Sequence, residues 1–103
     1  RFDDLMDNLL QHVETERTRV VILDLSSAIV EGNEVATQIA RTVRTVGLLG
    51  AECIIADMQI PMAKALEPLL GEIGNITSYN SMERALEDAL SRIGYEIRPR
   101  QQP

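Results

Sequence analysis

Apolar residues follow two different spacings along this chain of 103 residues. Val20–Leu23 and Cys53–Ala56 are continuous apolar runs, which are typical of strands covered on both faces in a parallel sheet. Elsewhere the apolar residues recur every three or four positions, which is the spacing of a helix with one buried face. The predicted helices cover Phe2–Val13, a segment from Asn33 to Gly47, a segment from Pro61 to Leu70, and a last segment that Asn80 or Ser81 caps.

The order of these elements predicts the fold class. A strand–helix–strand unit of this length implies that its two strands are parallel. Ile76–Ser78 is predicted to form a short edge strand. The side chains expected to face inward from the last helix are Met82, Leu86, Leu90 and Ile93. The alternation of strands and helices indicates an α/β fold with a small, mainly parallel sheet and four helices.

Composition excludes several classes of function. The formal charge is -6 and the sequence pI is near 4.7, so nucleic acids and anionic membranes are poor candidates as partners. No apolar run approaches the ~20 residues that a membrane span needs. The single cysteine, Cys53, lies in an apolar strand and fits a reducing compartment, so a cytoplasmic location is expected.

The chain is expected to form one domain over residues 1–95, followed by a polar, flexible tail over residues 96–103. Its first residue is Arg1 rather than methionine. We therefore expect the sequence to be a processed or excised piece of a longer protein.

Few residues are candidates for chemistry. Asp24 ends the first strand, where α/β proteins tend to bind ligands, and with Asp57 it could hold magnesium as in a receiver-like protein. No lysine lies at a strand end, however, and a turn-forming role for Asp24 is favoured. A serine nucleophile such as Ser26 needs a positioned base, and the only histidine, His12, lies on the first helix. We therefore predict a non-enzymatic protein without a metal or a cofactor.

Four stretches together carry a resemblance to a known family. They are Leu5–Leu10, Asp24–Ser27, Val35–Ala36 and Thr45–Cys53. The chain resembles the STAS family (sulfate transporter and anti-sigma factor antagonist domains), and most of all the regulator and scaffold proteins of the bacterial stressosome. The resemblance implies a STAS-like fold. It also implies N-terminal strands before the first helix, where this sequence begins. We therefore expect either that these strands lie outside this sequence or that one edge of the sheet is open.

The resemblance further implies a scaffold domain with no chemistry of its own. Its expected partners are other STAS proteins, in a homo- or hetero-oligomer, and a switch-type serine/threonine kinase or an anti-sigma factor. The alternative is the cytoplasmic STAS portion of an anion transporter. A less favoured alternative is the magnesium-dependent receiver-like protein that would use Asp24 and Asp57.

In this family a kinase often phosphorylates a Ser or Thr that follows an Asp at the start of the second helix. The matching positions here are Gly32 and Asn33, and asparagine has no hydroxyl to modify. A phosphate would add roughly -1.5 to -2 charge at a helix N-terminus. We therefore expect a domain fixed in one state or switched at another hydroxyl. The nearest candidates are Ser26, Ser27 and Thr37.

A second departure from the family follows the second strand. The family shows a Gly there with a Pro three residues later, whereas this chain has Asp57 and its Pro61 comes one position later. Two departures on one face predict altered partner specificity or a subunit kept for scaffolding alone. The residues expected at the partner interface are Glu31, Glu34, Met58, Ile60, Pro61 and Met62. The alternative for the Met58–Met62 loop is that it folds back onto the core.

Overall fold

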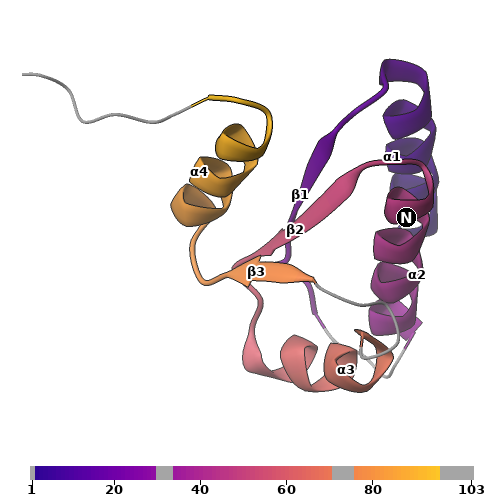
Figure 1. Cartoon of the computed structure of the whole chain (residues 1–103). Helices are drawn as coiled ribbons and strands as arrows, with labels where there is room; N and C mark the ends of the chain where they lie inside the picture. The colour runs from indigo at the N-terminus through magenta and orange to yellow at the C-terminus, as the bar shows by residue number, and fades with distance from the viewer. Residues whose placement is uncertain (1, 30–33, 71–75, 96–103) are drawn as a thin grey trace, which may run out of the picture.

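Seven elements alternate along the chain in the computed structural model, which describes residues 2–29, 34–70 and 76–95 (Figure 1). They are α1 (Phe2–Glu16), β1 (Val20–Asp24), α2 (Glu34–Leu48), β2 (Glu52–Ala56), α3 (Ile60–Leu70), β3 (Thr77–Tyr79) and α4 (Met82–Arg92). The predicted α/β class, with four helices and a small parallel sheet, is confirmed.

The three strands form one parallel sheet in the order β1-β2-β3. Asp24 lies opposite Ala56, and Ala56 lies opposite Tyr79, so all three strands end at the same edge. Within the described segments β1 pairs with β2 alone, which leaves its other edge open. β3 begins one residue later than predicted, at Thr77.

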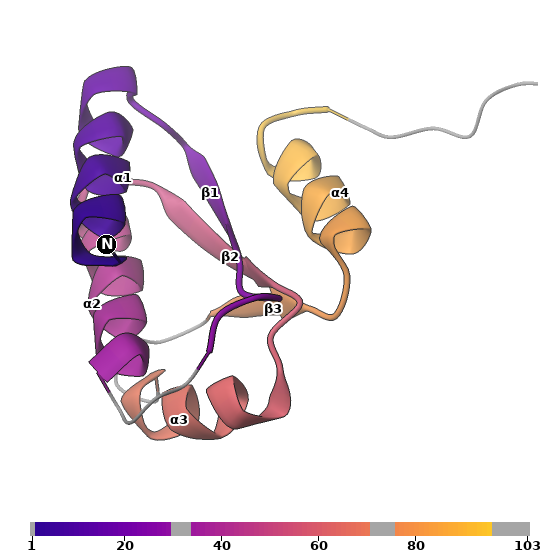
Figure 2. The same ribbon diagram turned by 180° about the vertical axis from the view of Figure 1, so that it is seen from behind.

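The helices lie on two sides of the sheet (Figures 1 and 2). Side chains of α1, α2 and α3 pack on one face, in a core that includes Ile55 of β2. α4 covers the other face, where it packs on Ile54 and Ala56. Because neighbouring strand residues point to opposite faces, the run Ile54-Ile55-Ala56 supplies both cores, and all three side chains are fully buried.

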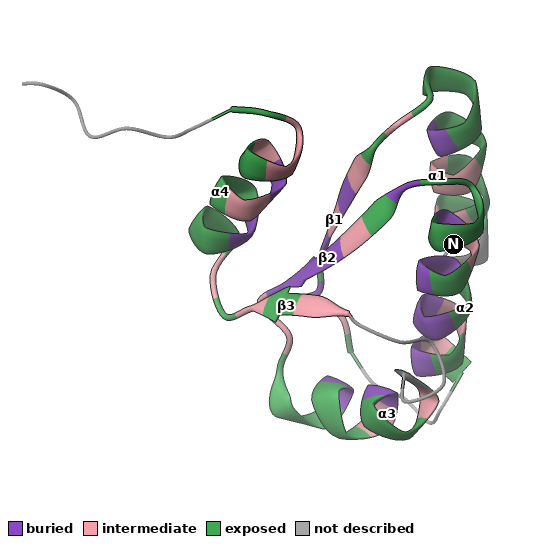
Figure 3. Ribbon diagram, in the orientation of Figure 1, coloured by how far each residue is buried: buried purple, intermediate pink, exposed green. Residues whose placement is uncertain are grey.

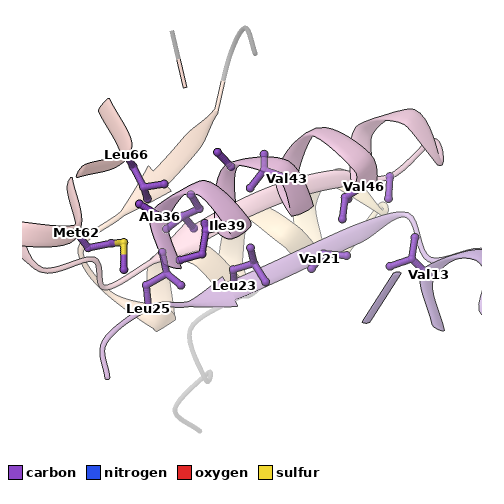
Figure 4. Packing of buried hydrophobic residues seen from close by; sticks show 13 residues of the cluster. Val13, Val21, Leu23, Leu25, Ala36, Ile39, Val43, Val46, Met62 and Leu66 are labelled. Carbon is purple, nitrogen blue, oxygen red and sulfur yellow. The ribbon is translucent and has the colours of Figure 1, made fainter. Parts of the chain in front are cut away.

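The larger core is aliphatic, as the low aromatic content of the chain requires (Figure 4). Ile39 and Val46 of α2 are almost completely buried against β1 and β2. Met62 and Leu66 of α3 close the core at the end where the strands stop. Figure 4 shows the side chain of Met62 beside Leu25, directed into the protein.

The orientation of α4 differs in part from the prediction. Of the four residues expected to face inward, Leu90 and Ile93 are half-buried. Met82 and Leu86, which were expected to face inward, are 36% and 45% exposed. The residues that pack on the sheet are instead Ala85 and Ala89 (Figure 3). The physical reason is that small alanine side chains allow a helix to lie close to a sheet face that Ile54 already fills, and the larger apolar residues then lie on the flank of the helix.

Two helix ends are fixed by local backbone geometry and hydrogen bonds rather than by packing. Ser81 is the N-cap of α4, and its hydroxyl accepts a 3.2 Å hydrogen bond from the Arg84 backbone, as its residue type predicts. The turn after α2 needs a left-handed residue, and Gly50 supplies it with φ +90°. This turn leads directly into β2, so it fixes where the second strand begins.

Candidate functional site

Two loops meet at the edge where the parallel strands end. One follows β1 and covers Leu25–Ile29, and the other joins β2 to α3 and covers Asp57–Gln59 (Figure 2). The backbone N–H of Leu25 donates a 2.9 Å hydrogen bond to the carbonyl of Ala56, which continues the strand pairing into the loops. Loops at this edge of an α/β sheet are the usual place for a functional site.

The loop after β1 is held by local hydrogen bonds between residues close in sequence. The Asp24 carboxylate accepts a 2.9 Å hydrogen bond from the backbone N–H of Ser26, and the N–H of Ala28 donates to the carbonyl of Leu25 at 3.2 Å. The bonds from the backbone and side chain of Ser26 lower the pKa of Asp24. The predicted turn-forming role of Asp24 is therefore confirmed.

The loop after β2 contains a left-handed residue. Asp57 has φ +57°, and its backbone N–H donates a 2.9 Å hydrogen bond to the carbonyl of Tyr79. This is the position where the resemblance places a glycine, the residue that adopts such a backbone most easily. Aspartate is one of the few other residues that tolerate it.

One side chain connects the two loops. The amide Nε2 of Gln59 donates a 2.7 Å hydrogen bond to the backbone carbonyl of Ser26, 33 positions earlier in the chain. Gln59 also accepts the first helical hydrogen bond of α3 at its own carbonyl, from the N–H of Ala63 at 2.9 Å. The start of α3 is thus linked to the loop that follows β1.

The residues predicted at the interface divide into surface and core. Ile60 is 71% exposed, and Pro61 is exposed beside it. Met58 is half-buried and packs on the larger core, while Met62 is fully buried in it. Met62 is therefore a core residue and is not at the surface, because the first turn of α3 points it at Leu25 (Figure 4). The alternative in which the loop folds back onto the core thus holds for Met58 and Met62, and Ile60 and Pro61 stay candidates for a partner interface.

The remaining predicted positions lie on or near α2. Glu34 is exposed in its first turn, and Thr37 is exposed one turn later. Ser26 and Ser27 are exposed in the loop after β1. The positions Glu31, Gly32 and Asn33 lie outside the described residues.

Sequence reasoning missed one exposed apolar residue at this edge. Ile29 is 72% exposed at the end of the loop after β1. The available signal was an isoleucine in a segment that belongs to neither a predicted strand nor a predicted helix. Two large apolar side chains are thus exposed at this edge, Ile29 at the end of the loop after β1 and Ile60 at the first residue of α3.

An apolar hollow extends from this edge along α1. It has a volume of about 570 Å³, and Leu5, Leu9, Leu23, Ala28 and Ile29 are among the residues that line it. Leu5 is 59% exposed. The hollow lies beside β1, the strand whose outer edge is open among the described residues.

The chemistry available in the described segments is limited. Across residues 2–29, 34–70 and 76–95, no three His, Cys, Asp or Glu side chains are grouped so that they could hold a metal ion. His12 is exposed on α1, in a shallow hollow lined by Asn8, Gln11 and Thr15. In the same segments, none of the helices has the length and apolar character needed to cross a membrane.

Comparison with known proteins finds a relative among the bacterial stress-response regulators. No protein-family model matches the chain. The chain is 28% identical over 93 residues to the "RsbT co-antagonist protein RsbRA" of Bacillus subtilis (strain 168). The match covers 90% of this chain but spans only about a third of the relative, 34% of its length. This similarity supports the predicted relation to STAS regulators of the RsbR type.

Proposed function

We propose that this chain is a non-enzymatic protein–protein interaction domain of a stressosome-type regulator or anti-sigma factor antagonist. It assembles with other STAS proteins and binds a switch-type serine/threonine kinase or an anti-sigma factor. The proposed setting is the bacterial cytoplasm, where a lone thiol such as Cys53 stays reduced. The relative's name, which describes a co-antagonist of RsbT, supports this function.

The observation that carries the proposal is the exposure of Ile29 and Ile60. Ile29 ends the loop after β1, and Ile60 begins α3 directly after Gln59, whose side chain is hydrogen-bonded to that loop. Large apolar side chains at the surface often mark a site of protein association. Pro61 extends the same surface at the first turn of α3, and Glu34 adds a charge at the start of α2. We name Ile29, Ile60, Pro61 and Glu34 the docking surface.

We further propose that the domain is fixed in one state at the usual switch position. The resemblance places Asn33 there, and asparagine cannot carry a phosphate. If a switch operates, the exposed hydroxyls of Ser26 and Ser27 are the first candidates because they lie in the loop that ends at Ile29. Thr37, exposed on α2, is the third candidate.

The interface is tested by truncating its apolar side chains in the full-length protein. Ile60→Ser and Ile29→Ser are compared with Leu48→Ser, because Leu48 is 85% exposed at the opposite end of α2. Binding to RsbT of Bacillus subtilis is measured by surface plasmon resonance, and assembly with a STAS scaffold partner by light scattering. We expect the first two variants to weaken association about tenfold and the control to leave it unchanged.

Equal binding by all three variants would remove the docking surface from the proposal. The fixed state has a separate test, which is intact-mass and peptide mass spectrometry after incubation with the switch kinase. We expect no stoichiometric phosphate on Ser26, Ser27 or Thr37. A full equivalent of phosphate on any of them contradicts the fixed state and identifies the alternative switch.

A further inference from the structure

Gln59 is hydrogen-bonded to two parts of the fold, to α3 through its backbone and to the loop after β1 through its side chain. It directly precedes α3, and its carbonyl accepts the first helical hydrogen bond, so its backbone moves with the helix. Its side-chain amide donates a hydrogen bond to the carbonyl of Ser26 at 2.7 Å. This bond joins segments that are 33 residues apart, at the edge that bears the docking surface.

Ser26 is held from two directions. Its backbone N–H donates to the Asp24 carboxylate at 2.9 Å, and its carbonyl accepts from Gln59 at 2.7 Å. Ile29 follows Ser26 by three residues, and Ile60 directly follows Gln59. Each end of the Gln59–Ser26 bond is therefore close in sequence to one of the two exposed isoleucines.

We infer that Gln59 is a positioning residue of the docking surface. Its side-chain amide holds the Leu25–Ile29 loop against the start of α3, which fixes Ile29 relative to Ile60 before a partner arrives. The inference rests on the proposed function, because it concerns how the same surface is kept ready for binding. A surface that is ordered in advance loses less conformational entropy on association.

The bond is exposed to solvent, so it contributes little to the stability of the whole domain. The larger core continues beneath the loops through Leu25 and Met62 and does not depend on Gln59. Loss of the bond is therefore expected to free the loop without unfolding the domain. Local opening of this kind is detected by amide hydrogen exchange.

The first measurement is hydrogen exchange of the full-length protein without a partner. Gln59→Met removes the donor at nearly constant length, and Gln59→Glu places a carboxylate opposite the Ser26 carbonyl. Gln11→Met, at an exposed glutamine of α1, is the matched control. We expect the amides of Ser26 and Ala28 to exchange about three- to tenfold faster in Gln59→Met and faster still in Gln59→Glu. The control and the urea midpoints are expected to match the wild type.

The second measurement is the affinity of the same variants for RsbT of Bacillus subtilis. We expect Gln59→Met to bind about three- to tenfold more weakly, with the apolar residues of the surface intact. Unchanged exchange at Ser26 and Ala28 overturns the inference and leaves the proposed function standing. Faster exchange with unchanged affinity shows that the bond orders the loop but does not position the surface, which also overturns it.

The proposed function fails by a different result. If Ile60→Ser binds RsbT as the wild type does, or if the wild type does not bind, the docking surface is not a site for that partner. The exchange experiment still decides whether Gln59 holds the loop, because it needs no partner. The two failures are therefore distinguishable.

Discussion

The phenol of Tyr79 on β3 donates a 2.7 Å hydrogen bond to the carboxylate of Asp88 on α4. The guanidinium of Arg92 donates to the same carboxylate at 2.8 and 3.1 Å. Arg92 also donates to the hydroxyl of Thr77 at 2.9 Å and forms an ion pair with Glu52 of β2. A single polar network thus joins α4 to β2 and β3. The buried residues of α4 are two alanines, Ala85 and Ala89, so the network adds polar contacts to a small apolar one.

The network predicts how stability depends on pH. The pKa of Asp88 is lowered by hydrogen bonds from Arg92 first and Tyr79 second. The ionised carboxylate therefore stabilises the folded protein fully above the unfolded-state pKa of about 4. This contribution is lost as the pH falls through the lower pKa that Asp88 has in the folded state. Asp88→Asn is expected to reduce the free energy of unfolding at pH 7 by about 1 kcal/mol. It should also flatten the loss of stability below about pH 4. Urea unfolding across this pH range checks both effects.

The control for this prediction is Asp4→Asn, which changes an exposed carboxylate on α1, outside the network. Its stability curve is expected to follow that of the wild type. If the Asp88→Asn curve coincides with the wild-type curve at every pH, the carboxylate contributes no stability, and the network does not tie α4 to the sheet.

The rotation of α4 gives a second prediction. Ala85 is fully buried against the sheet, so Ala85→Leu overfills the contact and is expected to cost about 1–3 kcal/mol of unfolding free energy. Leu86 is 45% exposed, so Leu86→Ala is expected to cost less than about 1 kcal/mol. Chemical denaturation of the two variants checks the order. A larger loss for Leu86→Ala would mean that the apolar stripe faces inward, as the spacing alone suggests.

Cys53 supplies a third prediction. Burial in β2 raises the pKa of its thiol to about 12, so very little thiolate forms at neutral pH. We expect the native protein to react with iodoacetamide at pH 8 at least about tenfold more slowly than the protein unfolded in urea. Mass spectrometry over time measures both rates. Equal rates would show that the thiol is accessible and ionises normally in the folded state.

The sequence was sufficient for the parts of the fold that depend on local pattern. The continuous run Val20–Leu23 predicted a strand, and the residue types at Asp24 and Ser81 predicted a turn and a helix cap. Helical spacing predicted where α4 lies but not which of its faces is buried. Leu86 and the neighbouring Ala85 are both apolar, and a helical stripe that faces the sheet can include either of them. That choice depends on how much space the opposing sheet face leaves.

The candidate site was less predictable for a related reason. Ile60 and Met62 are apolar residues two positions apart, yet one is exposed and the other buried, because the direction of each depends on where α3 begins. The bond from Gln59 to Ser26 depends on how the ends of two parallel strands meet. No local pattern in the sequence encodes a contact between residues so far apart.

The left-handed backbone of Asp57 gives the last prediction. At φ +57° a side chain with a branched β-carbon is crowded by the backbone, which costs roughly 1–2 kcal/mol, whereas glycine avoids this crowding. We expect Asp57→Val to destabilise the domain by about that amount. Asp57→Gly should instead be neutral or stabilising by up to about 1 kcal/mol, because part of the relief is offset by the greater freedom of glycine in the unfolded chain.

Urea unfolding of the two variants, with Asp57→Asn as the intermediate case, measures this order. Asparagine keeps the size of the side chain and tolerates the left-handed region, so it is expected to fall close to the wild type. A valine variant as stable as the glycine variant would contradict the positive φ. A glycine variant clearly less stable than the asparagine variant would show instead that a side chain at this position makes a stabilising contact.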